Sequence, residues 1–354
     1  MITIAVDAMG GDIGLSVTVP ASVAFLERQN DVKLLMVGDE AKLQAALKSV
    51  NAPMDRISVI HASEVVDMDE DPRNALRHKK DSSMRVAINQ VKEGLAEAAV
   101  SAGNTGALMA TAKFVLKTID GIERPAIAKF LPTSDGGLTC VLDLGANIDS
   151  TPEHLLQFAI MGSQLVQAVN PQVKSPRVGL LNIGSEEIKG NSTVKEAYHQ
   201  LQNSQLNFIG NVEGDDIFSG EVEVIVADGF VGNVALKTIE GTVKMMGQII
   251  KNEFNSSALT KAQGLIAKPV LAQVKKRIDP RRFNGAIFLG LRGVVVKSHG
   301  GTDAIGFSYA LEEAYHEAKA DSLAKIEQGV AAQLAVLAEQ KIEAEQTAIA
   351  DNIG

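Results

Sequence analysis

Glycine-rich loops that follow short apolar runs hold most of the residues in this sequence that could do chemistry. One of them, in SAGNTGALMA, contains Gly103, Asn104, Thr105 and Gly106, and two others, in DGFVGN and SHGGTDA, have the same layout. Such a turn at the start of a helix offers backbone N–H groups and the positive end of the helix dipole to an anion. One glycine turn can also simply start a helix, but three at one sheet edge favour a phosphate-binding site.

Side chains in and beside these loops could handle charge and protons. Lys189 in GSEEIKGN could neutralise a phosphate or a developing oxyanion, and His299 in SHGGTDA titrates near neutral pH. Lys189 could equally be a solvated loop lysine, and His299 could cap the helix that follows it. The other residues assigned to the candidate site are Asn147, Asn233, Gly300 and Gly301, and Lys297 lies beside them without an assigned role.

Familiar cofactor and nucleophile signatures are absent from the sequence. It contains no GxxxxGK[ST] loop, and its DAMGGDIG turn is not a GxGxxG fingerprint, so neither ATP nor NAD is expected. No Cys/His cluster has zinc spacing, and we expect no metal and no cofactor. There is no GxSxG elbow, and Cys140 lies within the apolar run LTCVL, where a buried structural thiol is the favoured interpretation.

The composition is that of a globular protein in a reducing compartment. The chain has 354 residues, of which 45% are hydrophobic and 22% are charged, and its net charge is -9 at pH 7. A negative net charge disfavours nucleic acid as a partner, so any acidic partner needs a local basic patch. The single cysteine, the lack of a signal-peptide pattern and the lack of a run of about 18 apolar residues predict a cytoplasmic location.

Short β-branched apolar runs alternate with helical patterns along the chain, which is typical of an α/β fold. The runs are nearly continuous hydrophobic stretches, as expected for strands covered by helices on both faces. We predict a single large α/β unit over residues 1–354, with a mostly parallel, twisted sheet flanked by helices and polar loops gathered at one edge. The expected strands span residues 2–6, 32–37, 98–100, 138–142, 178–183, 222–227 and 294–297.

A helical excursion at about residues 234–282 is the longest stretch without a strand signal. From residue 256 onward it is basic, with only Asp279 as an acid, and an apolar stripe recurs at helical spacing. Pro269 is expected to break this part into two helices. The residues proposed to contact a partner are Leu265, Ile266, Lys268, Lys275, Lys276 and Arg277.

Two amphipathic segments therefore need a surface to cover their apolar faces. Segment 256–282 could pack on the domain or a dimer partner, lie on an anionic membrane, or bind an acidic carrier protein. The chain should close with an amphipathic helix over residues 318–350. Its predicted apolar face consists of Leu323, Ile326, Val330, Leu334 and Leu337.

The complete set of loops resembles that of the PlsX family of bacterial phosphate acyltransferases. The motifs are IAVDAMGGD, SAGNTGALMA, LDLGAN, LLNIGSEEIKGN, ADGFVGNVALK and SHGGTDA, and the resemblance extends from Met1 to about Ala320. It implies reversible transfer of a long fatty acyl group from acyl carrier protein to inorganic phosphate, giving acyl phosphate for phospholipid synthesis. It also implies a homodimer with a fold like phosphotransacetylases and isopropylmalate dehydrogenases, and peripheral membrane association beside a membrane glycerol-3-phosphate acyltransferase. The family's motifs place Lys189 and Asn233 in the active site.

This chemistry agrees with the lack of an evident nucleophile. Phosphate can attack a thioester directly if the site binds a dianion, stabilises the oxyanion and protonates the leaving thiolate. On this hypothesis the loops from Gly103 to Gly106 and from His299 to Gly301 hold phosphate. Lys189 and Asn233 then stabilise charge, and Lys189 or His299 protonates the sulfur.

Three alternatives remain open from the sequence. An acetyl or butyryl transferase that uses coenzyme A shares the phosphate and thioester chemistry. A decarboxylating dehydrogenase of related fold would need a nicotinamide cofactor and an acidic metal site. A non-catalytic membrane scaffold would bind liposomes without any turnover.

Overall fold

Within residues 1–351, which the computed structural model describes together with the side chains up to residue 339, the chain forms one eleven-stranded sheet. The strand order is β3-β2-β1-β4-β11-β10-β5-β6-β9-β7-β8. The strands are β1 (Ile2–Asp7), β2 (Val32–Gly38), β3 (Ile57–His61), β4 (Ala98–Ser101), β5 (Ala126–Pro132), β6 (Leu138–Leu142), β7 (Arg177–Leu181), β8 (Asn207–Val212), β9 (Val224–Val226), β10 (Ala286–Leu289) and β11 (Val294–Lys297).

The sheet consists of two parallel halves that run in opposite directions. Strands β3, β2, β1, β4 and β11 are parallel to one another, and so are β6, β9, β7 and β8. Between them, β10 pairs antiparallel with β11 and β5, and β5 pairs antiparallel with β6. The prediction of a mostly parallel sheet is confirmed. The expectation that all the loops leave one common edge is wrong, because the direction of the strands reverses at the centre.

The pairing register nevertheless brings the carboxyl ends of both halves to the same level. Val296 of β11 pairs with Ile287, which pairs with Ala128 of β5. The neighbour of Ala128, Lys129, pairs with Val141, the residue before the end of β6. The last residues of β11 and β6 therefore lie within about one residue of each other along the strand direction, since each residue advances a strand by about 3.3 Å. The loops that follow these strand ends in the two halves therefore lie close to one another.

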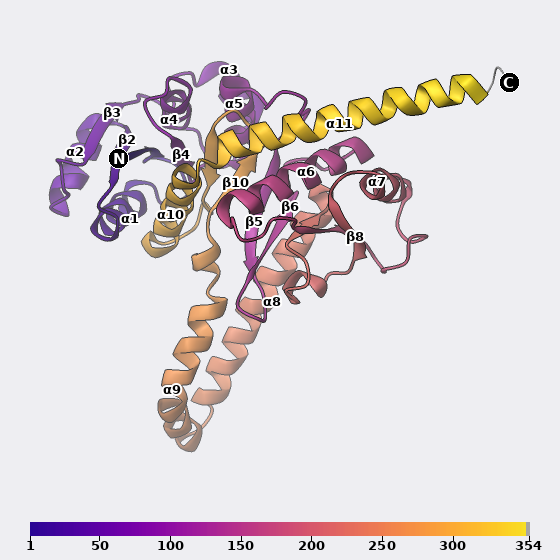
Figure 1. Ribbon diagram of the computed structural model, residues 1–354. Helices are drawn as coiled ribbons and strands as arrows, with labels where there is room; N and C mark the ends of the chain where they lie inside the picture. Colours follow the sequence, from indigo (N-terminus) through magenta and orange to yellow (C-terminus); the bar gives the residue numbers. More distant parts are fainter. Residues whose placement is uncertain (352–354) are drawn as a thin grey trace.

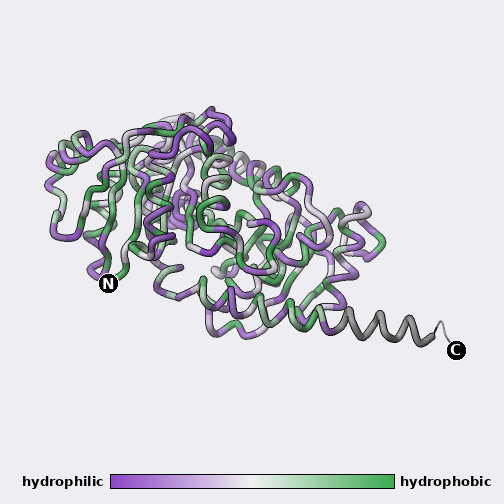
Figure 2. Tube along the Cα trace, turned by 90° about the horizontal axis from the view of Figure 1, so that it is seen from above, coloured by the Kyte–Doolittle hydropathy of each residue, from purple (hydrophilic) through white to green (hydrophobic). Residues whose placement is uncertain are grey.

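Helices cover both faces of the sheet. Successive side chains of a strand point to opposite faces, so each buried strand contributes to an apolar core on either side. Ile4 and Val6 of β1 belong to one core, with Phe25, Phe158 and Phe307, whereas Ala5 packs on the opposite face. Figure 2 shows the hydrophobic stretches mainly inside the molecule and hydrophilic loops around them. The helices are α1 (Leu15–Arg28), α2 (Glu40–Ser49), α3 (Pro72–His78), α4 (Ser83–Lys92), α5 (Thr105–Leu116), α6 (Pro152–Val169), α7 (Ser192–Gln202), α8 (Gly229–Asn255), α9 (Ala258–Ile278), α10 (Ala304–Ala320) and α11 (Ser322–Asp351).

The helical excursion is a hairpin of α8 and α9 that projects from the body of the molecule (Figure 1). The chain turns at Ser257, whose side chain accepts a hydrogen bond from the backbone of Thr260 while Thr260 reciprocates in a capping box. The prediction of a break at Pro269 is wrong, because this proline lies inside α9. It removes one backbone donor, and the exposed helix leaves the freed carbonyl open to water.

The closing helix begins later than expected. Helix α10 ends at Ala320, and Asp321 adopts a left-handed conformation, with φ 50°, that separates it from α11. Ile326 and Val330 are buried, and Leu334 packs beside them. The apolar face is therefore present through Leu337, while the side chains of 340–350 lie outside the described residues.

The close approach of α8 to the end of β6 gives a stability prediction. A Cβ built on Gly232 would lie 1.9 Å from the backbone oxygen of Asp143, whereas one on Gly241 meets no described atom within 4 Å. Gly232→Ala should lower the free energy of unfolding by about 1–3 kcal/mol through overpacking. Gly241→Ala should raise it by up to about 1 kcal/mol through helix propensity. Urea unfolding followed by circular dichroism measures both, and equal stabilisation by the two substitutions would contradict the close approach.

Candidate active site

A cavity of about 1290 Å³ opens where the two half-sheets meet and continues along the α8–α9 hairpin. The first half contributes Thr105 at the start of α5 and His299 after β11 to its walls. The second half contributes Gly145 after β6 and Asn233 in α8. Residues from four widely separated parts of the chain thus share one space.

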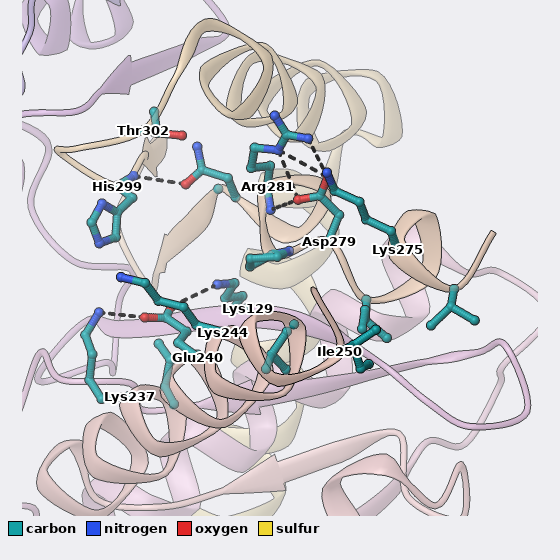
Figure 3. Close-up of a pocket in the computed structure, with 18 of the residues that line it drawn as sticks. Lys129, Lys237, Glu240, Lys244, Ile250, Lys275, Asp279, Arg281, His299 and Thr302 are labelled. Atoms are coloured by element: carbon teal, nitrogen blue, oxygen red, sulfur yellow. Dashed lines mark hydrogen bonds and ion pairs between the residues drawn. The ribbon is translucent and has the colours of Figure 1, made fainter. Parts of the chain in front are cut away.

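Lysine side chains make one end of this cavity positive. Lys237 and Lys129 both approach Glu240, with Nζ–Oε distances of 2.9 Å and 3.8 Å. Lys244 lines the same wall (Figure 3). Lys129 is largely buried, and the resulting desolvation lowers its pKa. Because a single carboxylate cannot neutralise three ammonium groups, this end of the cavity favours an anion.

His299 faces these lysines with a fixed orientation. Its backbone N–H donates to Asn284 Oδ1 at 2.9 Å, and its Nδ1 accepts a hydrogen bond from the N–H of Gly301 at 3.2 Å. Desolvation and then the positive charge of Lys237 lower the pKa of the ring. A neutral ring whose Nδ1 is an acceptor carries its proton on Nε2. His299 can therefore donate a hydrogen bond from Nε2 into the cavity.

Lys297 ends β11 as a buried cation in the wall of the same cavity. Its Nζ donates to the carbonyl oxygens of Ala102, at 3.3 Å, and of Ser298. Burial lowers the pKa of Lys297 to about 8, although the charges of Asp12 and Asp7 act in the opposite direction. An ammonium group has three donors, so one remains for a ligand. Lys297 can release or accept a proton near neutral pH.

The glycine loop before α5 is held in place by its own side chains. Asn104 caps the helix by accepting from the N–H of Ala107, and its Nδ2 donates to the carbonyl oxygens of Met68 and Glu70. The N–H of Gly103 donates to Ser101 Oγ at 3.0 Å. Asn104 and Gly103 therefore shape the turn. Within the described chain, the groups left to meet an anion are the hydroxyl of Thr105 and the first N–H groups of the helix, at Thr105 and Gly106.

The loop after β6 contains a residue that supports the loop, Asn147, and a residue that lies against the cavity residue Asn233, Gly145. Asn147 is buried, and its Nδ2 donates to the carbonyl oxygen of Pro125 at 2.8 Å and to Asp143 Oδ2 at 2.9 Å. Gly145, with φ +121°, approaches the side chain of Asn233, since a Cβ placed on it would lie 3.4 Å away. Asn147 thus supports the loop, while Asn233 lines the cavity.

Lys189 lies outside this cavity among the residues that the structure describes. It belongs to the loop between β7 and α7, its side chain is 44% exposed, and its Nζ is 4.0 Å from Glu186 Oε1. Gly300 and Gly301 follow His299, and the Gly301 N–H orients the His299 ring. Of the three residues predicted to be catalytic, the structure therefore brings His299 and Asn233 together and leaves Lys189 apart.

The basic segment forms the other side of the cavity and a broad exposed surface. Leu265 and Lys275 line the cavity, while Ile266 points outward and is 82% exposed. Helix α9, which is described over its whole length, buries none of its side chains. At its end Arg281 pairs with Asp279 and with Asp303, the N-cap of α10, at 2.7 Å and 2.8 Å. These ion pairs fix the base of the hairpin against the body.

Several cavity residues escaped the sequence analysis. Lys237, Glu240 and Lys244 recur at helical spacing on α8, which is a polar stripe that could have been recognised. Lys129 interrupts the apolar strand AIAKFLP, and a charged residue in a buried strand is itself a signal. Asn284, which positions His299, carries no such signal.

Over residues 1–351, no helix combines the length and the apolar character needed to cross a membrane. In the same part of the chain, no group of three or more His, Cys, Asp or Glu residues could hold a metal ion.

Comparison with known proteins assigns the family. The model of the fatty acid synthesis protein family matches residues 2–325. A phosphate acyltransferase of Neisseria meningitidis is 65% identical over 95% of this chain and 96% of its own length. Another, of Chromobacterium violaceum, is 59% identical over 97% of this chain and 99% of its own.

Solved structures support the fold alone, because their sequences are distant. A phosphotransacetylase from Streptococcus pyogenes superposes with a TM-score of 0.61 at 16% identity, over 90% of this chain and 94% of its own. A branched-chain phosphotransacylase from Enterococcus faecalis has a TM-score of 0.56 at 12% identity, over 90% of this chain and 99% of its own. The predicted phosphotransacetylase-like fold is confirmed.

Proposed function

The chain belongs to the PlsX family of fatty acid synthesis proteins and is a phosphate acyltransferase, and from this premise we propose that it transfers a long fatty acyl group from acyl carrier protein to inorganic phosphate. The reaction is reversible and forms acyl phosphate for phospholipid synthesis. It takes place at the cavity between the half-sheets and uses no cofactor.

The observation that carries this proposal is the continuity of a positive end and an apolar groove in one cavity. The positive end consists of Lys129, Lys237 and Lys244 around Glu240, opposite His299. Beyond it most of the lining is hydrophobic, formed by Leu236, Val243, Ile250 and Phe254 of α8 and by Leu271 and Val274 of α9, although Lys251, Lys261 and Lys275 also line the cavity. An acyl phosphate has the same two parts, since an anionic phosphate is joined to an apolar chain.

Direct attack by phosphate accounts for the chemistry without an enzyme nucleophile. A phosphate oxygen forms a bond to the thioester carbonyl carbon, the carbon–sulfur bond breaks, and the thiolate takes a proton. Cys140 is unsuited to carry an acyl group because it is buried in β6 and burial raises its pKa. Positioning of phosphate and thioester in one cavity replaces covalent catalysis.

The geometry supports different roles for Lys297, the last residue of β11, and for His299 in the loop that follows. Lys297, with a pKa of about 8, is matched to an ordinary thiol near 8.5 and donates the proton to sulfur. The Nε2–H of His299 stabilises the oxyanion. Lys297 thus replaces Lys189 and His299, the two donors proposed from the sequence, because it is buried in the cavity wall and titrates in the required range.

Acyl carrier protein would dock on the basic side of α9. Lys268, Lys276 and Arg277 lie on this exposed helix, next to the cavity residue Lys275. The whole chain has a net charge of -9, so this local positive surface is what allows it to attract an acidic protein. Docking there would place the thioester at the mouth of the groove.

The exposed apolar side chains of the hairpin would be covered by a second copy of the chain and by the membrane surface. Leu265 is 73% exposed, Ile266 82% and Val270 64%. Exposed apolar residues in such density mark an interaction surface. Contact with a bilayer would let the apolar product pass to a membrane glycerol-3-phosphate acyltransferase.

The function is tested with palmitoyl-acyl carrier protein, with and without inorganic phosphate. Free carrier thiol and acyl phosphate trapped by hydroxylamine should appear in equal amounts, and only when phosphate is present. Thiol release without phosphate would instead show a thioesterase. A strong preference for coenzyme A thioesters would support the acetyl or butyryl type of transferase.

The roles of Lys297 and His299 predict distinct kinetic changes. Lys297 is charged below pH 8, so kcat of the wild type should fall as pH rises through about 8. Lys297→Met should lower kcat by roughly 100-fold or more and abolish this alkaline fall. His299→Ala should lower kcat by a similar factor through loss of oxyanion stabilisation but keep the pH dependence. Lys189→Ala, measured in parallel, tests the role in charge stabilisation or proton donation that was predicted for Lys189 from the sequence. A kcat near the wild-type value in both Lys297→Met and His299→Ala would contradict the proposed site.

Membrane contact through the exposed apolar side chains of α9 predicts the effect of placing charge on them. Leu265→Glu combined with Ile266→Glu should abolish binding to vesicles that contain anionic lipid, because charged side chains cannot enter the apolar boundary. Far-ultraviolet circular dichroism checks the fold, and sedimentation shows whether the same face also holds a second copy. Vesicle binding that survives both substitutions would rule out membrane contact through this face.

A further inference from the structure

We propose that Gly247 on α8 sets the length of the acyl chain that the cavity accepts, and that the contact of Phe254 with Gly264 closes the far end of the groove. This inference rests on the proposed function, because it assigns the substrate's chain to the apolar part of the same cavity. It goes further by naming the residues that limit the chain.

The groove follows one face of α8 along the hairpin. Its apolar lining residues on this helix, together with Gly247, are Leu236, Val243, Ile250 and Phe254, and the five positions are spaced by seven, four, three and four residues. Such spacing keeps them on one side of a helix. Helix α9 runs back antiparallel and contributes Leu265, Leu271, Val274 and Ile278 to the opposite wall. Lys244 and Lys251 of α8 and Lys261 and Lys275 of α9 also line this part of the cavity. Apolar residues of both helices therefore extend toward the tip of the hairpin, with lysines beside them.

Gly247 is the position where this wall has no side chain. A Cβ built on it would meet no described atom within 4 Å, although the residue lines the cavity. The glycine therefore does not serve a close approach of the two helices at this point. Gly247 instead leaves the groove open, and any side chain added at this position would project into the groove.

The two helices come into contact near the tip. A Cβ on Gly264 would lie 3.0 Å from Cδ1 of the Phe254 ring, so the ring lies directly against the backbone of α9. Both residues line the cavity. Phe254 and Gly264 thus form its end, beyond which the chain cannot extend.

The rise per residue of α8 relates these positions to lengths of the acyl chain. At 1.5 Å per residue, Gly247 lies about 15 Å along α8 from Lys237, and Phe254 about 26 Å. Each methylene of an extended chain adds roughly 1.3 Å, given carbon–carbon bonds of about 1.5 Å. A chain of about a dozen carbons therefore reaches Gly247, and a longer one must pass it.

The test compares palmitoyl- and octanoyl-acyl carrier protein in the full-length protein with phosphate. Gly247→Leu should lower kcat/KM for the palmitoyl thioester at least tenfold and leave that for the octanoyl thioester within about twofold. Gly247→Ala should give an intermediate ratio and provides the measurement if the leucine variant fails to fold. By the same figures, Phe254 lies about 20 carbons along the chain, so a stearoyl thioester should already fit. Phe254→Ala should raise the rate with a docosanoyl thioester, which has a longer chain, relative to palmitoyl, because it opens the end of the groove.

Gly241→Leu is the matched control. Gly241 lies on the same helix and is equally open, but it does not line the cavity in the described structure, so its substitution should change neither rate. If the ratio of kcat/KM for the palmitoyl thioester to kcat/KM for the octanoyl thioester stays at the wild-type value in both Gly247 variants, the inference is overturned while the proposed function still stands. Failure of the wild type to form acyl phosphate from either thioester would overturn the proposed function instead.

Discussion

The hydrogen-bonded ladder through β10, β5 and β6 joins two parallel half-sheets that run in opposite directions, and its register decides where their loops lie. Val141 lies opposite Lys129, and Ala128 lies opposite Ile287, so the end of β6 is level with the end of β11. A shift of one residue would turn each side chain to the other face of the sheet. Lys129 would then leave the cavity.

This arrangement makes one site from parts that are distant in sequence. The first half-sheet supplies His299 and Lys297, and α8, which follows β9 of the second, supplies Asn233, Lys237 and Lys244. Lys129 comes from β5, between the two halves. The protein walls strengthen electrostatic interactions there, so fixed donors stabilise phosphate and a developing oxyanion without reorganisation. The same helix then continues as the wall of the apolar groove (Figure 3), which links the chemistry to the length of the substrate.

Most of the fold and part of the site could be predicted from the sequence. Buried parallel strands are apolar runs before polar segments, and His299 lies in the loop after β11 while Asn233 lies near the start of α8, which follows β9. The sequence analysis missed four strands. Two of them, β3 and β8, are the edge strands, β5 carries Lys129, and β10 is an apolar run of only four residues. Asn104 and Asn147 have the chemistry of ligands, but their amides donate to the backbone of other segments, at Met68 and Pro125. Only three-dimensional contacts separate such supporting residues from those that face a substrate.

The most direct test of this account is a crystal structure of the protein with palmitoyl phosphonate, a stable analogue of acyl phosphate. The phosphonate should contact groups of both half-sheets, with His299 on one side and Asn233 on the other. Its alkyl chain should run between α8 and α9, past Gly247. A phosphonate bound in the loop of Lys189, with its chain outside the hairpin, would contradict it.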